Sequence, residues 1–198
     1  MWWNLVSTGA LVLQLSKENA HMATSKKPTS QDAVTLLKAD HRKVEDLFEK
    51  FEKSRGKKAE IARQICLELS VHAMIEEEIF YPACKDAVEE DKLDEAYVEH
   101  DGAKVLIAEI SAGSPDDDFY DAKVKVLSEE IKHHVKEEER PDGIFAQAKA
   151  SELDLKALGA RLAARKEELL AQFSNDGLPP PLTRTMKECK LERGAPVN

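Results

Sequence analysis

Residues 72–76 read His-Ala-Met-Ile-Glu, and residues 134–138 read His-Val-Lys-Glu-Glu. In both stretches an imidazole precedes a carboxylate by four positions, which on a helix places the two side chains one above the other on the same face. Two further histidines, His41 and His100, lie in the two other helical stretches between residues 33 and 148. The pattern predicts four helices that each carry one histidine where a core residue is expected.

The apolar residues around these histidines recur with a helical period. Between residues 58 and 81 the inward positions follow one another at steps of three and four. These positions are Ile61, Ile65, Leu69, His72, Glu76 and Ile79. Similar stripes predict helices over 31–53 and 93–111 and from 120 to a stop near Pro141-Asp142-Gly143, while Pro82 predicts an end or a bend in the second helix. The expected fold is all-α, an up-and-down antiparallel four-helix bundle with an additional C-terminal helix.

Successive histidines are spaced symmetrically about the expected turns. The midpoint of His41 and His72 lies beside Gly56, and the next two midpoints lie just after Pro82 and in the aspartate run after Pro115. In an up-and-down bundle, residues equidistant from a turn lie at the same height. A slip of two residues would displace a histidine by only about 3 Å. All four imidazoles are therefore expected in one layer of the bundle interior.

Four histidines in one layer with two glutamates favour a metal site. A lone histidine on an apolar face is usually a core residue with a hydrogen-bond partner. Glu76 and Glu138, however, would each be a buried charge that costs several kcal/mol unless it is paired or bound to metal. Imidazole and carboxylate without thiolate suit iron, zinc, manganese or copper, and two carboxylates able to bridge favour a dinuclear centre over one tetrahedral zinc. The HExxH motif is absent, and within the expected bundle Glu130–His133 is the only Glu-x-x-His, so a ferritin-like di-iron bundle would lack its second motif.

Composition narrows the functional class. The chain has 198 residues, a net charge of −9 and a 34% share of charged residues. The acidic balance argues against a nucleic-acid partner and against an anionic membrane surface, because both need clustered lysine and arginine. Cys66, Cys84 and Cys189 form no CxxC pair. They are typical of reduced thiols, so we expect a cytoplasmic protein.

The two ends of the chain are expected to lie outside the bundle. Residues 2–15 are mostly apolar but too short to span a bilayer and lack a preceding basic residue, so a signal peptide is the weaker alternative to a native start at Met22. We therefore expect residues 1–30 to be an extension, disordered or not native before Met22, and the bundle to occupy 31–148. Residues 149–175 predict an amphipathic helix that either covers the bundle or pairs with another copy of the chain. The remainder, 176–198, is proline-rich at its start and predicts a disordered tail.

Several short motifs resemble the hemerythrin family, and specifically its bacterial HHE cation-binding branch. They are Asp40-His41 with Leu47-Phe48, His72 through Glu76-Glu77 to Phe80-Tyr81-Pro82, Glu99-His100, and His134 through Glu138-Glu139. The likeness covers residues 33–148. It implies two non-haem iron ions in a carboxylate- and oxo-bridged centre, with four histidines as terminal ligands and two glutamates as bridges. The implied ligands are His41, His72, Glu76, His100, His134 and Glu138.

The chain also departs from the oxygen-carrying hemerythrins. Their third helix supplies two histidines four positions apart, whereas here the position four after His100 is occupied by Lys104. Their fourth helix places an aspartate five positions after its histidine, whereas here Glu138 lies four after His134. One nitrogen ligand is therefore missing, which leaves an open position or requires another residue; Glu45 is a candidate ligand or an ordinary solvated glutamate.

Some neighbouring residues have two possible roles. Glu68 and Glu130 precede His72 and His134 by four residues, and either accept the free ring N–H groups or lie on the bundle rim. Tyr97 either lines the pocket or packs. His133 is expected to point away from the site.

The implied function is a di-iron protein that binds, stores or senses O2 or a related small molecule such as nitric oxide. The apolar walls around the centre would exclude water and large anions. The alternative is an enzyme with peroxidase-like or iron-donating stress-repair activity. A sensor that contacts a partner through its C-terminal helix is a third hypothesis.

Overall fold

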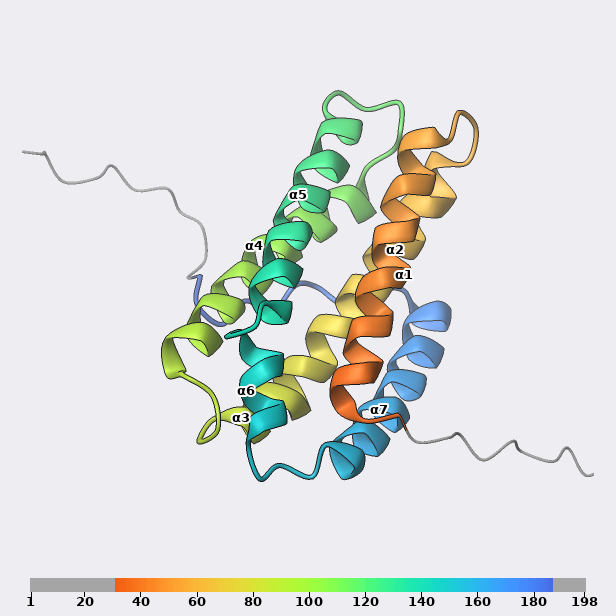
Figure 1. Cartoon of the computed structure of the whole chain (residues 1–198). Helices are drawn as coiled ribbons and strands as arrows, with labels where there is room; N and C mark the ends of the chain where they lie inside the picture. Colours follow the sequence, from red (N-terminus) through yellow and green to blue (C-terminus); the bar gives the residue numbers. More distant parts are fainter. Residues whose placement is uncertain (1–30, 187–198) are drawn as a thin grey trace, which may run out of the picture.

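The computed structural model describes residues 31–186, which contain helices and connecting segments and no strand. The helices of the bundle run alternately up and down (Figure 1). In chain order the elements are α1 (Ala33–Lys53), α2 (Lys58–Ile75), the π-helix η1 (Glu76–Phe80), α3 (Tyr81–Cys84), α4 (Glu90–Ala112), α5 (Tyr120–Glu139), α6 (Ile144–Ala150) and α7 (Leu155–Asp176). The predicted all-α bundle, formed by α1, α2, α4 and α5 with an additional C-terminal helix, is confirmed.

The second long helix does not end at Pro82. It continues through η1 and α3 to Cys84, so the bend expected from the proline takes the form of a π-helical turn just before it. A proline lacks an amide hydrogen and crowds the carbonyl four residues earlier, which a regular α-helix cannot accommodate. In an α-helix, residues five apart differ by about 140° around the axis. The i→i+5 pitch of the π-helix, seen in the bond from the Tyr81 amide to the Glu76 carbonyl, instead returns Tyr81 to the face of Glu76.

The expected C-terminal helix forms as α7 and lies across α1 and α2 (Figure 1). Its side chains Leu162, Leu169 and Phe173 are buried in one cluster with the apolar residues of α1 and α2. A Cβ on Gly159 would lie 2.1 Å from the carbonyl oxygen of Gln31, so the backbone of α7 touches the start of α1 closely enough to require glycine. Of the two arrangements expected for this helix, the structure shows the one in which it covers the bundle.

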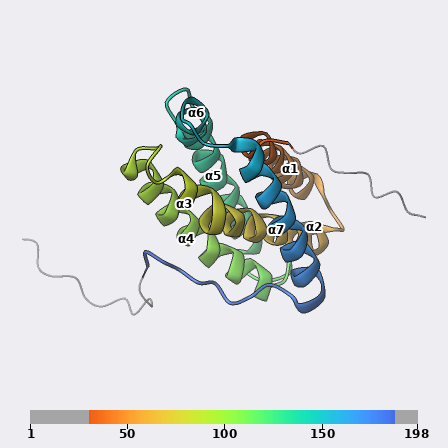
Figure 2. The same cartoon turned by 90° about the horizontal axis from the view of Figure 1, so that it is seen from below.

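Two further segments complete the fold. The short helix α6 was not predicted; it follows the break at residues 140–143 and buries Ile144 and Phe145. Residues 177–186, the start of the tail that was predicted to be disordered, have no helix or strand and run as an extended segment from α7 past α2 and α4 (Figure 2). Residues 1–30, with Met22, and 187–198 lie outside the described residues. No helix within 31–186 is both long enough and apolar enough to cross a membrane.

Candidate metal centre

The structure brings the four predicted histidines together from four helices. His41 comes from α1, His72 from α2, His100 from α4 and His134 from α5, and all four are buried. The Nε2 atoms of His41 and His72 are 3.1 Å apart, and those of His100 and His134 are 3.2 Å apart. Two facing imidazole pairs therefore form one layer, as the symmetric spacing about the turns predicts.

Glu76 and Glu138 lie between these pairs and are almost fully buried. Oε2 of Glu76 is 3.1 Å from Nε2 of His72 and 3.4 Å from Nε2 of His100. Oε2 of Glu138 is 3.3 Å from Nε2 of His41 and 3.5 Å from Nε2 of His134. Each carboxylate therefore faces one imidazole of each pair, which is the placement that a bridging ligand needs.

The donor atoms form two groups that share Glu76. One group contains His41, His72, Glu76 and Glu138, and the other contains Glu76, His100 and His134; within each group the donor atoms lie within 4.8 Å of one another. Glu138 is counted in the first group, but its Oε2 also lies 3.5 Å from Nε2 of His134, so each imidazole pair faces both glutamates. The missing ligand noted in the sequence is the nitrogen that Lys104 replaces on α4, so it belongs to the α4–α5 half.

Each imidazole faces a carboxylate of a neighbouring helix on its outer side, and three of the four are hydrogen-bonded to it. Nδ1 of His41 is 2.8 Å from Glu139, Nδ1 of His100 is 3.1 Å from Glu77, and Nδ1 of His134 is 2.7 Å from Glu99. Nδ1 of His72 is 3.6 Å from Oδ2 of Asp40, which is longer than a hydrogen bond. These four carboxylates are Asp40, Glu77, Glu99 and Glu139, and each is the immediate sequence neighbour of a site residue on its own helix.

This arrangement fixes the ring tautomers of three histidines. An ionised carboxylate only accepts hydrogen bonds, so Nδ1 of each of these imidazoles donates its hydrogen outward. The Nε2 lone pair is then directed into the site, as in histidines that bind metal.

Several residues that the sequence offered for the site lie outside it. Glu45 pairs with Arg42 at 3.2 Å and belongs to neither donor group. Glu130 is exposed and lies on the rim, whereas Glu68 is buried but pairs with Lys43, so the ring-holding role falls to the other carboxylates. His133 is exposed, as expected.

Tyr81 belongs to the site and was not identified from the sequence. Its hydroxyl donates to Oε1 of Glu138 at 2.9 Å and lies 3.4 Å from both Oε2 of Glu76 and Nε2 of His100. Burial and the charges of Glu138 and Glu76 raise the pKa of Tyr81 well above its ordinary value, so the phenol keeps its proton. The signal in the sequence is the spacing of five residues from Glu76 to Tyr81. In an α-helix this spacing places the two side chains on different faces, and only the π-helical turn brings them to the same face.

The electrostatics of the layer favour positive charge. Burial disfavours the imidazolium of His72, but the charges and hydrogen bonds of Glu76 and Asp40 outweigh this and raise the pKa of His72 to about 10. Burial is likewise overcome at His100, where Glu76 and Glu77 raise the pKa to about 9. Burial also opposes ionisation of Glu76, yet His72 and His100 lower its pKa well below the ordinary value. The carboxylates therefore hold cations in this layer, which can be protons or metal ions.

Metal ions fit the donor atoms that the protein itself leaves without partners. Among the described residues, Oε1 of Glu76 and Oε2 of Glu138 are buried without a hydrogen-bond partner, which costs about 1–3 kcal/mol or more for a charged group. Metal–nitrogen bonds of about 2.1 Å at right or tetrahedral angles place two ligand nitrogens about 3.0–3.4 Å apart. The two Nε2 separations, 3.1 and 3.2 Å, both match this requirement.

Comparisons with known proteins agree with this architecture. The family model of the hemerythrin HHE cation binding domain matches residues 32–142. A crystal structure of a hemerythrin HHE cation binding domain-containing protein from Mycobacterium kansasii superposes with a TM-score of 0.63 at 22% identity, over 75% of this chain and 95% of that one, which shows a shared fold.

A curated relative has a different name. A DNA nickase of Nostoc sp. (strain PCC 7120 / SAG 25.82 / UTEX 2576) is 33% identical over 106 residues, which is 52% of this chain. The matched stretch covers only 30% of that protein.

Proposed function

This chain belongs to the hemerythrin HHE cation binding domain family, and on that basis we propose that it holds a non-haem di-iron centre that binds, stores or senses O2 or a related small molecule such as nitric oxide. The proposed ligands are His41, His72, Glu76, His100, His134 and Glu138.

The observation that carries this proposal is the sharing of Glu76 by two donor groups. One closed tetrahedral site would use four donors and leave the other imidazole pair facing each other without a cation between them. Two ions use all four imidazoles, and each of the two glutamates contacts both pairs. The donor chemistry, nitrogen and carboxylate oxygen without sulfur, suits iron.

The protein residues around the centre support small-ligand binding. When bound, an iron pair supplies reversible change between ferrous and ferric states. Val135, Leu69 and Ile107 line the cavity beside the histidines and exclude water and hydrated anions. The α4–α5 half, which lacks the nitrogen that Lys104 replaces, is where a small ligand would find a free position.

A peroxidase-like activity is the second candidate, and Tyr81 favours it. Its phenol holds a proton 3.4 Å from Nε2 of His100, on the half of the site that lacks the nitrogen that Lys104 replaces. A positioned phenol of this kind can deliver a proton to a reacting group. Consumption of peroxide by the iron-loaded protein, lost in Tyr81→Phe at unchanged iron content, would favour the enzyme.

Iron loading tests the proposal directly. The full chain is loaded with Fe(II) without air and then exposed to air, and iron content and the optical spectrum are followed. We expect about two irons per chain and a charge-transfer band in air for the wild type, both lost in Glu76→Ala. Glu78→Ala is the matched control, because Glu78 lies in the same π-helical turn but pairs with Arg165 at the surface. A single tightly held zinc, or no specific iron uptake, would contradict the proposal.

The similarity to a nickase does not alter the proposed partner class. A net charge of −9 opposes binding to a polyanion, because phosphate neutralisation requires clustered lysine and arginine. We therefore propose that the chain does not act on nucleic acid. Nicking of supercoiled plasmid by the purified metal-loaded chain would show this to be wrong.

A further inference from the structure

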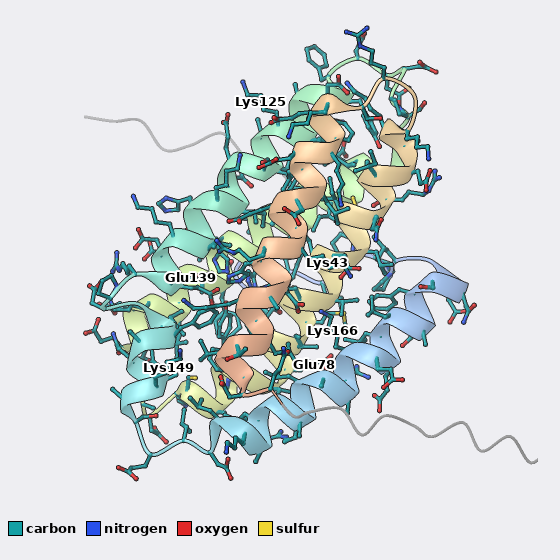
Figure 3. All side chains as sticks on the ribbon, turned by 45° about the vertical axis from the view of Figure 1, so that its right-hand side comes forward. Lys43, Glu78, Lys125, Glu139, Lys149 and Lys166 are labelled. Atoms are coloured by element: carbon teal, nitrogen blue, oxygen red, sulfur yellow. The ribbon has the colours of Figure 1, made fainter. Side chains whose placement is uncertain are left out.

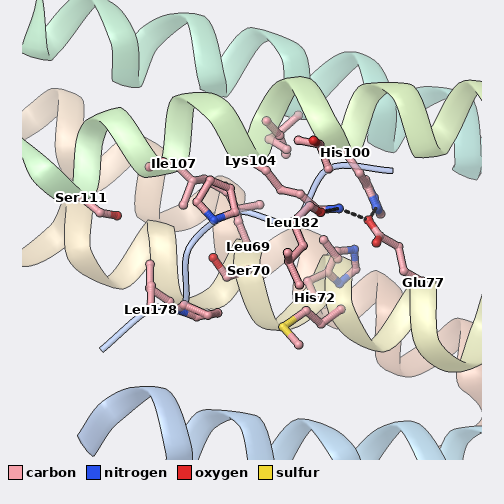
Figure 4. Close-up of a pocket in the computed structure, with 18 of the residues that line it drawn as sticks. Leu69, Ser70, His72, Glu77, His100, Lys104, Ile107, Ser111, Leu178 and Leu182 are labelled. Atoms are coloured by element: carbon pink, nitrogen blue, oxygen red, sulfur yellow. Dashed lines mark hydrogen bonds and ion pairs between the residues drawn. The ribbon is translucent and has the colours of Figure 1, made fainter. Parts of the chain in front are cut away.

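A large cavity begins at the four histidines and extends between α2 and α4 to the segment after α7 (Figure 4). Its volume is about 740 Å³. The walls are mostly apolar and include Val44, Leu69, Ala103, Ile107, Ile131 and Val135. The histidines form its polar end, so a molecule in this chamber would touch the metal centre.

Residues 178–186, which we call the C-terminal strap, form the roof of the chamber. Buried Oδ2 of Asp101 accepts hydrogen bonds from the backbone amides of Arg184 at 2.8 Å and Thr185 at 2.6 Å, and from the Thr185 hydroxyl at 2.8 Å. Nζ of Lys104 donates to the carbonyl oxygen of Leu182 at 3.2 Å. These bonds fix the strap across the mouth of the chamber and convert a groove between two helices into a covered space.

The cations at the roof are already neutralised. Lys104 contacts Glu77 at 2.7 Å and Asp101 at 3.1 Å. Arg184 contacts Glu77 at 3.4 Å and stacks on Tyr97. Lys104 and Arg184 are the lysine and the arginine that line the chamber within the described part of the chain. An anionic group under the strap, away from the histidine layer, would therefore bury its charge without a free partner, which is costly.

The volume exceeds what a diatomic ligand requires. An apolar cavity of about 150 Å³ is enough for one benzene molecule, and sites for small organic molecules typically measure about 300–1,000 Å³. We propose that the chamber is a binding site for an uncharged apolar organic molecule, which lies under the strap and against the histidine layer. This inference goes beyond the proposed function and does not require the metal, so the two can fail separately.

The test uses Nile red, an uncharged dye that fluoresces in apolar surroundings, with the full-length protein in metal-free and metal-loaded form. We expect saturable binding to both forms and displacement by 1-decanol. Ala108→Trp and Ser70→Trp fill the roof end of the chamber from α4 and α2, and each should weaken dye binding at least about tenfold. Because both positions are partly exposed, these variants avoid the buried core, and circular dichroism verifies their folding.

The matched control is Val105→Trp, which places the same side chain on the solvent-exposed face of α4 and should leave the dye affinity unchanged. Equal binding by the control and both filling variants would overturn the proposal. A second outcome would also overturn it, namely dye binding by the full-length double variant Leu11→Ser/Leu13→Ser but not by the wild type. The wild-type chamber would then hold the chain's own apolar stretch, residues 2–15, and not a separate molecule. Dye binding without iron uptake would support the chamber and contradict the di-iron centre alone.

Discussion

The α1–α2 half of the metal centre and the α4–α5 half carry the same pair of imidazoles but are held differently from outside. On the α1–α2 side, Asp40 forms an ion pair with Lys166 of α7, whose long axis crosses α1 and α2 (Figure 3). On the α4–α5 side, Glu77 is held by Lys104, which also binds the C-terminal strap. A helix with a buried apolar face therefore supports one half, and a segment without regular structure supports the other.

This difference coincides with the nitrogen that the α4–α5 half lacks, since Lys104 stands four positions after His100 and also binds the strap. The comparison leads us to propose that the α1–α2 half retains its ion more firmly and that the α4–α5 half receives ligands.

Removing one histidine from each half in turn should show the largest difference between the two halves. His100→Ala leaves His134 with Glu76 and Glu138, and His72→Ala leaves His41 with the same two glutamates. We expect roughly 10–100-fold weaker affinity for one ion in His72→Ala, and a larger loss in His100→Ala, because the α4–α5 half already lacks the nitrogen that Lys104 replaces. Metal content by mass spectrometry after dialysis against a weak chelator measures both.

The matched control is His133→Ala, because His133 is exposed and adjacent to a site histidine. It should bind as many ions as the wild type. Equal losses in His72→Ala and His100→Ala would mean that the two halves do not differ.

The histidine layer could be predicted from the sequence, since antiparallel helices with short turns place residues equidistant from a turn at one height. That rule depends on counting residues and needs no knowledge of how the helices rotate about their axes. His41, His72, His100 and His134 therefore met as expected, and the glutamates four positions later lie between the two imidazole pairs.

The partners of the imidazoles could not be predicted in the same way. Glu68 on the same helix was one candidate acceptor for His72, but it pairs with Lys43, and the carboxylate that faces Nδ1 of His72 is Asp40 of α1, at 3.6 Å. Which residue of a neighbouring helix reaches a ring depends on helix rotation and crossing, which one chain's periodicity does not specify. Tyr81 was missed because a π-helical turn changes the periodicity itself.

The strap was missed for another reason. It has no apolar period, and its contacts with Asp101 join residues more than eighty positions apart. A composition rich in proline and polar residues predicts disorder unless a distant partner is known.

Neutralising the outer carboxylates should produce a smaller difference between the halves. Glu77→Gln weakens the acceptor of His100, 3.1 Å from its Nδ1, whereas Asp40→Asn affects a longer 3.6 Å contact with His72. Loss of such a partner typically lowers metal affinity about 10–100-fold. We therefore expect Glu77→Gln to lower the affinity of the α4–α5 ion more than Asp40→Asn lowers that of the α1–α2 ion, measured by chelator competition.

Glu78→Gln serves as the control for both variants, because Glu78 pairs with Arg165 away from the donor atoms. A larger effect of Asp40→Asn would reverse the assignment of the more easily perturbed half.

The smallest difference between the two halves should appear in the metal-free protein, in the pH dependence of its free energy of unfolding. Glu76 contributes to raising the pKa of both His72, to about 10, and His100, to about 9, from an ordinary value of 6.5. A group with a raised pKa stabilises the folded state fully below its unfolded pKa, and this contribution is lost as the pH rises through the folded value. The free energy of unfolding should therefore fall between about pH 6.5 and 10, with His100 losing its contribution before His72.

Urea unfolding at pH 6 and pH 9 in the presence of chelator measures this fall, and Glu76→Gln should reduce it, because that substitution removes a carboxylate that holds both imidazoliums. Metal must displace the same protons, so the affinity for metal should rise over the pH range in which the metal-free protein loses stability. If the metal-free protein were instead more stable at pH 9 than at pH 6, the layer would not be holding protons in place of metal. The two halves would then differ only in the nitrogen that Lys104 replaces, and not in the positive charge that their carboxylates attract.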